Sequence, residues 1–325
     1  MQANVFRQDL IDVKLHPTGH AGFRICRAAI PDLTDFIDDI EIRDATTGVL
    51  LFRNFREDQH LPAKVLRFEM QAMPYASIEA AWSKHFSLYY NAIERYPFET
   101  LFGILNNPVV KSIALSGRPN LARYEQLFRD REYKLVTLLR DPYEELAERL
   151  LFYRYALSPS APARFKDHLS DLSDLRVVTQ RFDPSNLPTL AESFAYLSDR
   201  QLMDLSNPLV RALACTAEDP IPRTHHVEIA LGRLATFDLV GTRVQFDIFK
   251  NSLGEIAGAP ILKQEELVTM ELLKPIAEEL KNIKIVRSLL SLDSKLYEFS
   301  VEAVRRALST SSSSQKRARQ LHHAQ

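Results

Sequence analysis

The stretch that decides the fold is Tyr133-Lys-Leu-Val-Thr-Leu-Leu-Arg140-Asp141-Pro142-Tyr143. Its apolar run ends at a polar turn, and an apolar pattern of helical period follows, which predicts a buried strand that leads into a helix. This order is typical of a βαβ unit in an α/β protein. Arg140 is then expected at the carboxyl edge of the sheet, where its guanidinium can bind an anion beside the amino terminus of the next helix.

Composition narrows the class of protein. The chain has 325 residues, 46% of them apolar and 26% charged, which is enough for one large or two modest domains. Its 41 basic and 42 acidic residues nearly cancel, so no basic field indicates a nucleic-acid partner. No run reaches the roughly 18 apolar residues of a membrane span, and no signal-peptide core is seen at the start. Two cysteines, Cys26 and Cys215, favour a reducing cytoplasm.

Three parts are expected along the chain. Residues 1–60 are predicted to be a small β-rich part, with a strand over Leu10–His16 and a hairpin over Ile40–Arg53 around an Asp/Thr/Gly turn. Residues 61–308 are predicted to form the α/β domain, whose mostly parallel sheet is flanked by helices. The serine-rich, basic segment 309–325 is predicted to be a disordered tail.

An aromatic stripe predicts the first helix of the α/β domain. Aromatic and aliphatic side chains follow one another at spacings of three and four from about Ile78, which is the period of one helix face. A stripe of this kind is more often core than binding surface, so the prediction is structural. Its members are Trp82, Phe86, Tyr89, Tyr90 and Ile93.

Four segments in one order resemble the sulfotransferase family of carbohydrate-modifying and bacterial enzymes, over roughly residues 116–260. They are Ser116-Gly117, Leu139-Arg140-Asp141-Pro142, Asn207-Pro208-Leu-Val-Arg211, and Ala230 to Gly241 with Phe246 behind it. The resemblance implies a sulfotransferase-like, P-loop-NTPase-like α/β fold that binds 3′-phosphoadenosine 5′-phosphosulfate. It also implies that Arg140 contacts the 3′-phosphate of that donor.

The chain departs from the family pattern at three places. Family members carry a serine eight positions after the arginine, where this chain has Glu148, and an ionised carboxylate cannot donate to a phosphate. The family's Gly-x-Thr-Glu-Arg-Phe pattern appears as Gly241-Thr-Arg-Val-Gln-Phe246, without the Glu-Arg pair. The third departure is in the phosphate loop.

The family's phosphate loop has the form Pro-Lys-Thr-Gly-Thr, and its best counterpart is the segment His16 to Arg24, which contains no lysine. Thr18 and Gly19 would hold the 5′-phosphosulfate, and Lys14, His20 or Arg24 could replace the lysine. His16 or His20 is the candidate base near the acceptor hydroxyl, since histidine titrates in the right range. An ordinary loop or hairpin is at least as good an interpretation of this segment.

No metal site is expected from the sequence. His225 and His226 are adjacent in a predicted helix, so we expect their side chains to point to different faces, and no Cys or carboxylate lies at ligand spacing. An acidic cluster before the hairpin is typical of a solvated surface. Its members are Asp35, Asp38, Asp39 and Glu41.

The sequence thus predicts a sulfotransferase-like protein that transfers a sulfuryl group to a hydroxyl of a saccharide or another small-molecule acceptor. Because of Glu148 and the missing loop lysine, two other functions stay open. One is a catalytically degenerate binding or scaffold protein of the same fold with a protein partner. The other is an accessory transferase in polysaccharide assembly, with the hairpin as its docking surface.

Overall fold

The computed structural model describes most of the 325 residues. Side chains are not described at 9–10, 21–22, 51, 76 and 310–322. The described ranges are 5–6, 8–12, 17–22, 27–28, 30–35, 37, 40–43, 50–70, 76–108, 110–161, 175–267 and 269–322.

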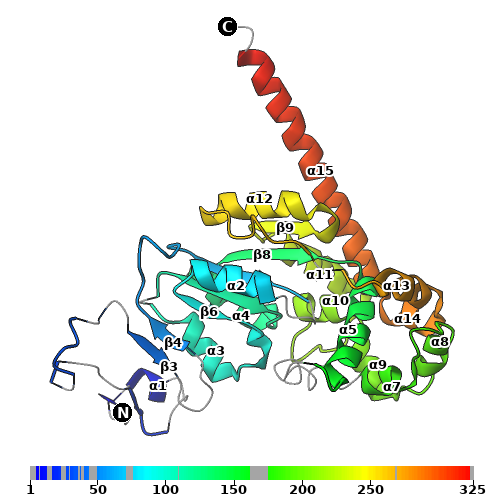
Figure 1. Ribbon diagram of the computed structural model, residues 1–325, viewed down its shortest axis with the longest axis horizontal. Coiled ribbons are helices and arrows are strands. Elements are labelled where there is room, and N and C mark those ends of the chain that lie inside the picture. The colour runs from blue at the N-terminus through cyan, green and yellow to red at the C-terminus, as the bar shows by residue number, and fades with distance from the viewer. Residues whose placement is uncertain are drawn as a thin grey trace.

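The centre of the molecule is a five-stranded sheet in which every strand is parallel to its neighbours (Figure 1). The strand order is β6-β7-β5-β8-β9, so the first of these strands in the chain lies in the middle. The strands are β5 (Lys64–Phe68), β6 (Leu88–Tyr90), β7 (Ile113–Gly117), β8 (Lys134–Leu139) and β9 (Leu239–Thr242). The predicted α/β class and mostly parallel sheet are confirmed.

Helices cover both faces of this sheet. Val65 of β5 packs on one face with Trp82 of α2 (Ala76–His85) and Phe249 of α12 (Phe246–Ala257). The adjacent residue Leu66 packs on the opposite face, because successive side chains of a strand alternate. That second face is covered by α3 (Phe98–Leu105), α4 (Leu121–Asp130), α10 (Pro208–Ala214) and α11 (Thr224–Leu234). Burial on both faces explains why these strands are continuous apolar runs.

A second core lies in a helical region beside the sheet. Its centre is α5 (Pro142–Leu157), which packs along α13 (Leu273–Asn282). The remaining members are α7 (Arg176–Arg181), α8 (Thr189–Phe194), α9 (Asp199–Leu205) and α14 (Lys284–Leu289).

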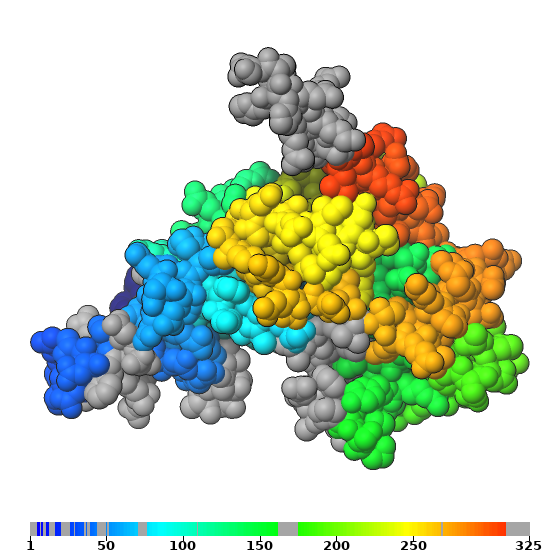
Figure 2. All heavy atoms as spheres, turned by 45° about the horizontal axis from the view of Figure 1, so that its top comes forward, coloured from blue at the N-terminus to red at the C-terminus, as the bar shows by residue number. Residues whose placement is uncertain are grey.

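The last helix, α15 (Ser291–His322), starts against both cores and then leaves the body of the molecule (Figures 1 and 2). Its bounds include most of the segment for which the sequence predicts a disordered tail. None of the helices in the described ranges has both the length and the apolar character needed to cross a membrane.

The first 60 residues contribute two small antiparallel sheets. One pairs β1 (Val5–Phe6) with β2 (His20–Gly22), and the other pairs β3 (Glu41–Arg43) with β4 (Leu50–Arg53), which confirms the predicted hairpin. The predicted strand over Leu10–His16 is wrong in its first part, because α1 (Gln8–Asp12) is a helical turn there. Gln8 Nε2 donates to Asp12 Oδ1 across that turn at 2.8 Å. Residues 13–16 lie outside the described ranges.

The predicted helix from Ile78 to Ile93 ends earlier than expected. After His85 the chain enters β6, so Tyr89 and Tyr90 belong to a strand that pairs with β7. Trp82 and Phe86 stay on the helical side and stack on each other with ring centroids 5.6 Å apart. The spacing of these aromatic residues fits one helix, but Tyr89 and Tyr90 lie in a strand because their backbone pairs with β7.

The strand order also defines where a ligand would bind. After β5 the chain continues to β6 on one side of the sheet, and after β8 it continues to β9 on the other side. The carboxyl ends of the adjacent strands β5 and β8 therefore flank a topological switch point. In open α/β sheets, ligands bind in the crevice at such a point.

Candidate functional site

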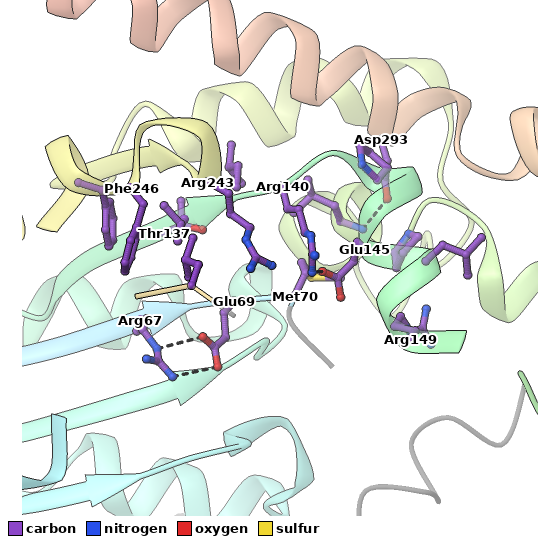
Figure 3. A pocket seen from close by; sticks show the side chains of 18 of the residues that line it. Arg67, Glu69, Met70, Thr137, Arg140, Glu145, Arg149, Arg243, Phe246 and Asp293 are labelled. Atoms are coloured by element: carbon purple, nitrogen blue, oxygen red, sulfur yellow. Dashed lines mark hydrogen bonds and ion pairs between the residues drawn. The ribbon is translucent and has the colours of Figure 1, made fainter. Parts of the chain in front are cut away.

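A pocket lies at this switch point (Figure 3). Its wall receives Arg67 and Glu69 from the end of β5, Thr137 and Arg140 from β8, and Arg243 from the 3₁₀ helix η4 (Arg243–Gln245) after β9. The free volume is about 70 Å³. The rest of the wall is mainly apolar, and includes Met70, Ile78, Leu138, Leu139, Leu146, Leu205, Leu209, Phe246, Leu262, Leu267 and Leu290.

Local sequence fixes the position of Arg140. Asp141 caps the amino terminus of α5, and its Oδ1 accepts from the N–H groups of Tyr143 at 2.8 Å and Glu144 at 3.2 Å. Pro142 takes the first helical position, where the lack of an N–H costs nothing. The strand and the helix start are therefore as the sequence predicts, and together with the cap at Asp141 they hold Arg140 at the carboxyl edge of the sheet.

Arg140 lies in a cluster of buried charges. Its guanidinium donates to the Glu148 carboxylate, and it lies 3.5 Å from Glu144 and 3.7 Å from Glu145. Glu148 is also 3.8 Å from Arg243, and its side chain is only 1% exposed. Because burial penalises a charged carboxylate, the pKa of Glu145 is raised, although Arg140 opposes the shift.

The two glutamates have different places relative to the pocket. Glu145 is part of the wall, and Figure 3 shows its carboxylate and the Arg140 guanidinium pointing toward each other. Glu148 holds the Arg140 guanidinium and is not one of the described residues that form the wall. The resemblance implied that position 148 and Arg140 act together, and the structure brings these two side chains into contact.

The other side of the pocket has its own ion pair. Arg67 lies 3.0 Å from Glu69, and its guanidinium also donates to Ser116 Oγ at 2.9 Å and covers the ring of Trp82. Glu69 directly follows the first strand of the sheet, where a phosphate loop of the family type would begin. The segment Glu69-Met-Gln-Ala-Met-Pro-Tyr75 contains neither glycine nor lysine.

The N-terminal loop candidates lie elsewhere in the fold. Thr18 and Gly19 precede β2, and His20 begins it, in a sheet that pairs only β1 with β2. None of these three is among the described residues that line the pocket with Arg140. His16 and Arg24 lie outside the described residues, so their assigned roles stay predictions.

The expectation that His225 and His226 point apart is wrong. Their rings lie 4.0 Å apart, and their Nε2 atoms lie 3.6 Å and 3.3 Å from Asp219 Oδ2. The three ligand-type groups could be taken for a metal site. However, His226 Nδ1 accepts the N–H of Arg223 at 2.9 Å, so the neutral ring carries its proton on Nε2, the atom that faces Asp219. Metal-bound histidines show the opposite arrangement, because their second nitrogen donates. The cluster therefore caps α11.

Sequence reasoning missed Asp293, a buried carboxylate in the pocket wall. It accepts the N–H groups of Leu209 at 2.9 Å and Val210 at 2.8 Å, at the amino terminus of α10. Burial raises its pKa to about 7, although these two hydrogen bonds oppose the shift. Asp293 is separated from Leu209 and Val210 by more than 80 residues, so no short motif indicates the contact.

Fold and pocket together define an α/β protein with a five-stranded parallel sheet and an arginine-rich pocket at the switch point of that sheet. No protein-family model matches the chain, and no curated protein matches it. The sulfotransferase resemblance thus rests on the motifs alone.

Proposed function

We propose that the chain is a sulfotransferase-like binding protein that holds a small anion in the switch-point pocket and transfers no sulfuryl group. One observation carries the proposal. Three arginines from three different elements, Arg140 after β8, Arg149 on α5 and Arg243 on η4, line the same pocket. Guanidinium groups in a partly apolar pocket are suited to carboxylate and phosphate oxygens.

The acidic neighbours do not cancel this preference. Glu148 contacts Arg140 and Arg243 but is not among the described wall residues, so it orients the two guanidinium groups. Glu145 does belong to the wall, but Arg140 lies 3.7 Å from its carboxylate, and Arg149 and Arg243 line the same wall. An anion that enters the pocket therefore meets mainly positive side chains on the α5 side.

The same geometry disfavours sulfuryl transfer. A transferase needs cationic groups around the oxygen that leaves the donor, and the family supplies a loop lysine for this purpose. Here the first strand of the sheet leads into Glu69 and a segment without lysine. The free volume of about 70 Å³ is less than half of the roughly 150 Å³ of a cavity that holds benzene, so the pocket does not enclose a nucleotide.

Isothermal titration with inorganic phosphate at constant ionic strength tests the proposal. Phosphate should bind to the wild-type protein, and Arg243→Ala should weaken this binding at least tenfold, the equivalent of about 1.4 kcal/mol. Arg129→Ala is the matched control, since Arg129 is a largely exposed arginine of α4. Equal affinities in all three proteins would exclude the pocket as the anion site.

Sulfuryl transfer is the second candidate function, and the position of Arg140 favours it. Arg140 lies at the carboxyl edge of the sheet beside the amino terminus of α5, which is an anion-binding place in α/β proteins. Titration with adenosine 3′,5′-bisphosphate separates the two functions. Micromolar binding that Arg140→Ala abolishes would support a transferase that uses 3′-phosphoadenosine 5′-phosphosulfate, and a saccharide acceptor would then be sought.

A further inference from the structure

We infer that the anion of this pocket is a short aliphatic carboxylate, whose head group is held by the arginines and shares one proton with Glu145. The inference rests on the proposed function, since it names the ligand class of the same pocket. Three properties of the pocket support it. They are the arginine cluster, a buried carboxylate oxygen that no donor reaches among the described residues, and an otherwise mainly apolar wall around a small free volume.

The arginine cluster selects the head group. Arg140, Arg149 and Arg243 present planar donors that match the two oxygens of a carboxylate. In Figure 3 the side chains of Arg140 and Arg243 lie next to each other and point in the same direction, on the side of Glu145 and Met70. A planar carboxylate between these groups would accept hydrogen bonds from both side chains.

Glu145 supplies the second property. Its residue is only 8% exposed, and its Oε1 atom is buried with no hydrogen-bond partner among the described residues. A buried acceptor of this kind is costly unless a donor reaches it. A ligand carboxyl group that brings one proton satisfies Oε1 with a single O–H···O bond, because two carboxyl groups at contact distance hold one proton between them.

The charges around Glu145 favour such a pair. Arg140, Arg149, Arg243 and Arg118 all act on its carboxylate, and Asp293 and Glu69 lie in the same pocket wall. On its own helix, Glu144 and Glu148 contact Arg140. One shared proton keeps two adjacent carboxyl groups at a single negative charge, which the arginines of the wall balance.

The apolar part of the wall and the free volume of the pocket define the alkyl chain of the ligand. Leu138, Leu139, Leu146, Leu205 and Phe246 lie in the wall beside the charged end, and a short alkyl chain can pack on them. The free volume is about 70 Å³. A cavity of about 150 Å³ holds benzene, which has six non-hydrogen atoms, so this pocket suits a smaller ligand of acetate or propionate size.

Titration calorimetry with acetate, propionate, butyrate and octanoate tests the inference, with propionamide as the neutral isostere and inorganic phosphate as the general anion. Acetate or propionate should bind at least tenfold more tightly than propionamide, and butyrate and octanoate should bind more weakly than propionate. Titration at pH 7 to 8.5, in two buffers with different ionisation heats, should show the uptake of about one proton, with an affinity that falls about tenfold per pH unit.

Two conservative variants distinguish a role of Glu145 and Arg243 in ligand binding from a role in the structure alone. Glu145→Gln should keep propionate binding and lose both the proton uptake and the pH dependence, since the amide is a permanent donor. Arg243→Lys should weaken propionate binding at least tenfold, whereas the control Arg129→Lys should leave it unchanged. The inference would be overturned if propionate bound no better than propionamide, or if binding took up no proton. If phosphate binding still depended on Arg243 in that case, the proposed function would stand. No binding of any anion would overturn both.

Discussion

The Arg140 guanidinium donates to the Glu148 carboxylate eight residues further along the chain, and both side chains are almost completely buried. The same carboxylate lies 3.8 Å from Arg243, so one glutamate connects the end of β8 with the turn after β9. Burying charges is costly, and removing one partner of a buried pair costs more than the pair contributes. The contact therefore makes Glu148 a positioning residue for two of the four arginines in the wall.

Glu148→Ala is expected to destabilise the protein strongly, because it leaves Arg140 and Arg243 without their shared carboxylate. The expected loss in the free energy of unfolding is about 3 to 5 kcal/mol. Glu144→Ala serves as the control, since Glu144 also contacts Arg140 but is one-third exposed, and it should cost at most about 1 kcal/mol. Urea unfolding followed by circular dichroism measures both values. Similar small losses in the two variants would show that the Glu148 contact is not important for stability.

A second prediction concerns Asp293 and pH. Its pKa of about 7 in the folded protein lies above the ordinary value of 3.8, so the folded state binds the proton more tightly than the unfolded state. The stabilising contribution is complete below pH 4 and is lost as the pH rises toward 7, with a slope of up to about 1.4 kcal/mol per pH unit. Asp293→Asn should flatten this part of the stability profile.

The measurement for Asp293 is urea unfolding at pH values from 4.5 to 8. The matched control is Asp247→Asn, because the side chain of Asp247 is 90% exposed and should leave the profile unchanged. If the Asp293→Asn profile parallels that of the wild type, the buried carboxylate does not titrate between pH 4 and 7.

The sequence alone predicts the part of the site formed by β8 and α5, but not the part formed by β5 or the contact of Asp293. The strand before Arg140 and the helix after it depend on neighbours in the chain, so the local sequence pattern is sufficient to predict them. The sequence pattern does not indicate the first strand of the sheet, β5, and the best candidate for the phosphate loop in the sequence lies near Gly19 instead. Lys-Val-Leu-Arg-Phe is short and contains two basic residues, and it is a strand because it pairs with β7 and β8 on both sides. Contacts between distant segments, such as Asp293 with α10, leave no periodic signal.

Two glycines offer a matched pair for testing the packing of β9. A Cβ atom added at Gly241 would lie 2.5 Å from Cδ2 of Phe249, whereas one added at Gly232, in the last turn of α11, would meet nothing within 4 Å. Gly241→Ala should therefore cost about 1 to 3 kcal/mol by overpacking. Gly232→Ala should stabilise the helix by about 0.5 to 1 kcal/mol.

Thermal unfolding of the two glycine variants compares these effects directly. Combining Gly241→Ala with Phe249→Leu should cost less than the sum of the two single substitutions, because the smaller side chain makes room for the added methyl group. Strictly additive losses would mean that the contact with Phe249 is not the reason for glycine at position 241.

The last prediction concerns Asn207, which joins α10 to the start of α15. Its backbone is left-handed, with φ 44° and ψ 57°, and its Oδ1 accepts the N–H groups of Leu292 at 2.8 Å and Asp293 at 3.1 Å. Asn207→Gly keeps the backbone conformation and loses the acceptor, so it should cost about 1 to 3 kcal/mol for the unsatisfied donors. Asn207→Ala loses the acceptor and also strains the left-handed backbone, which should add about 1 to 2 kcal/mol. Chemical denaturation of both variants separates the two contributions, and equal losses would show that the left-handed conformation is relieved when the side chain is removed.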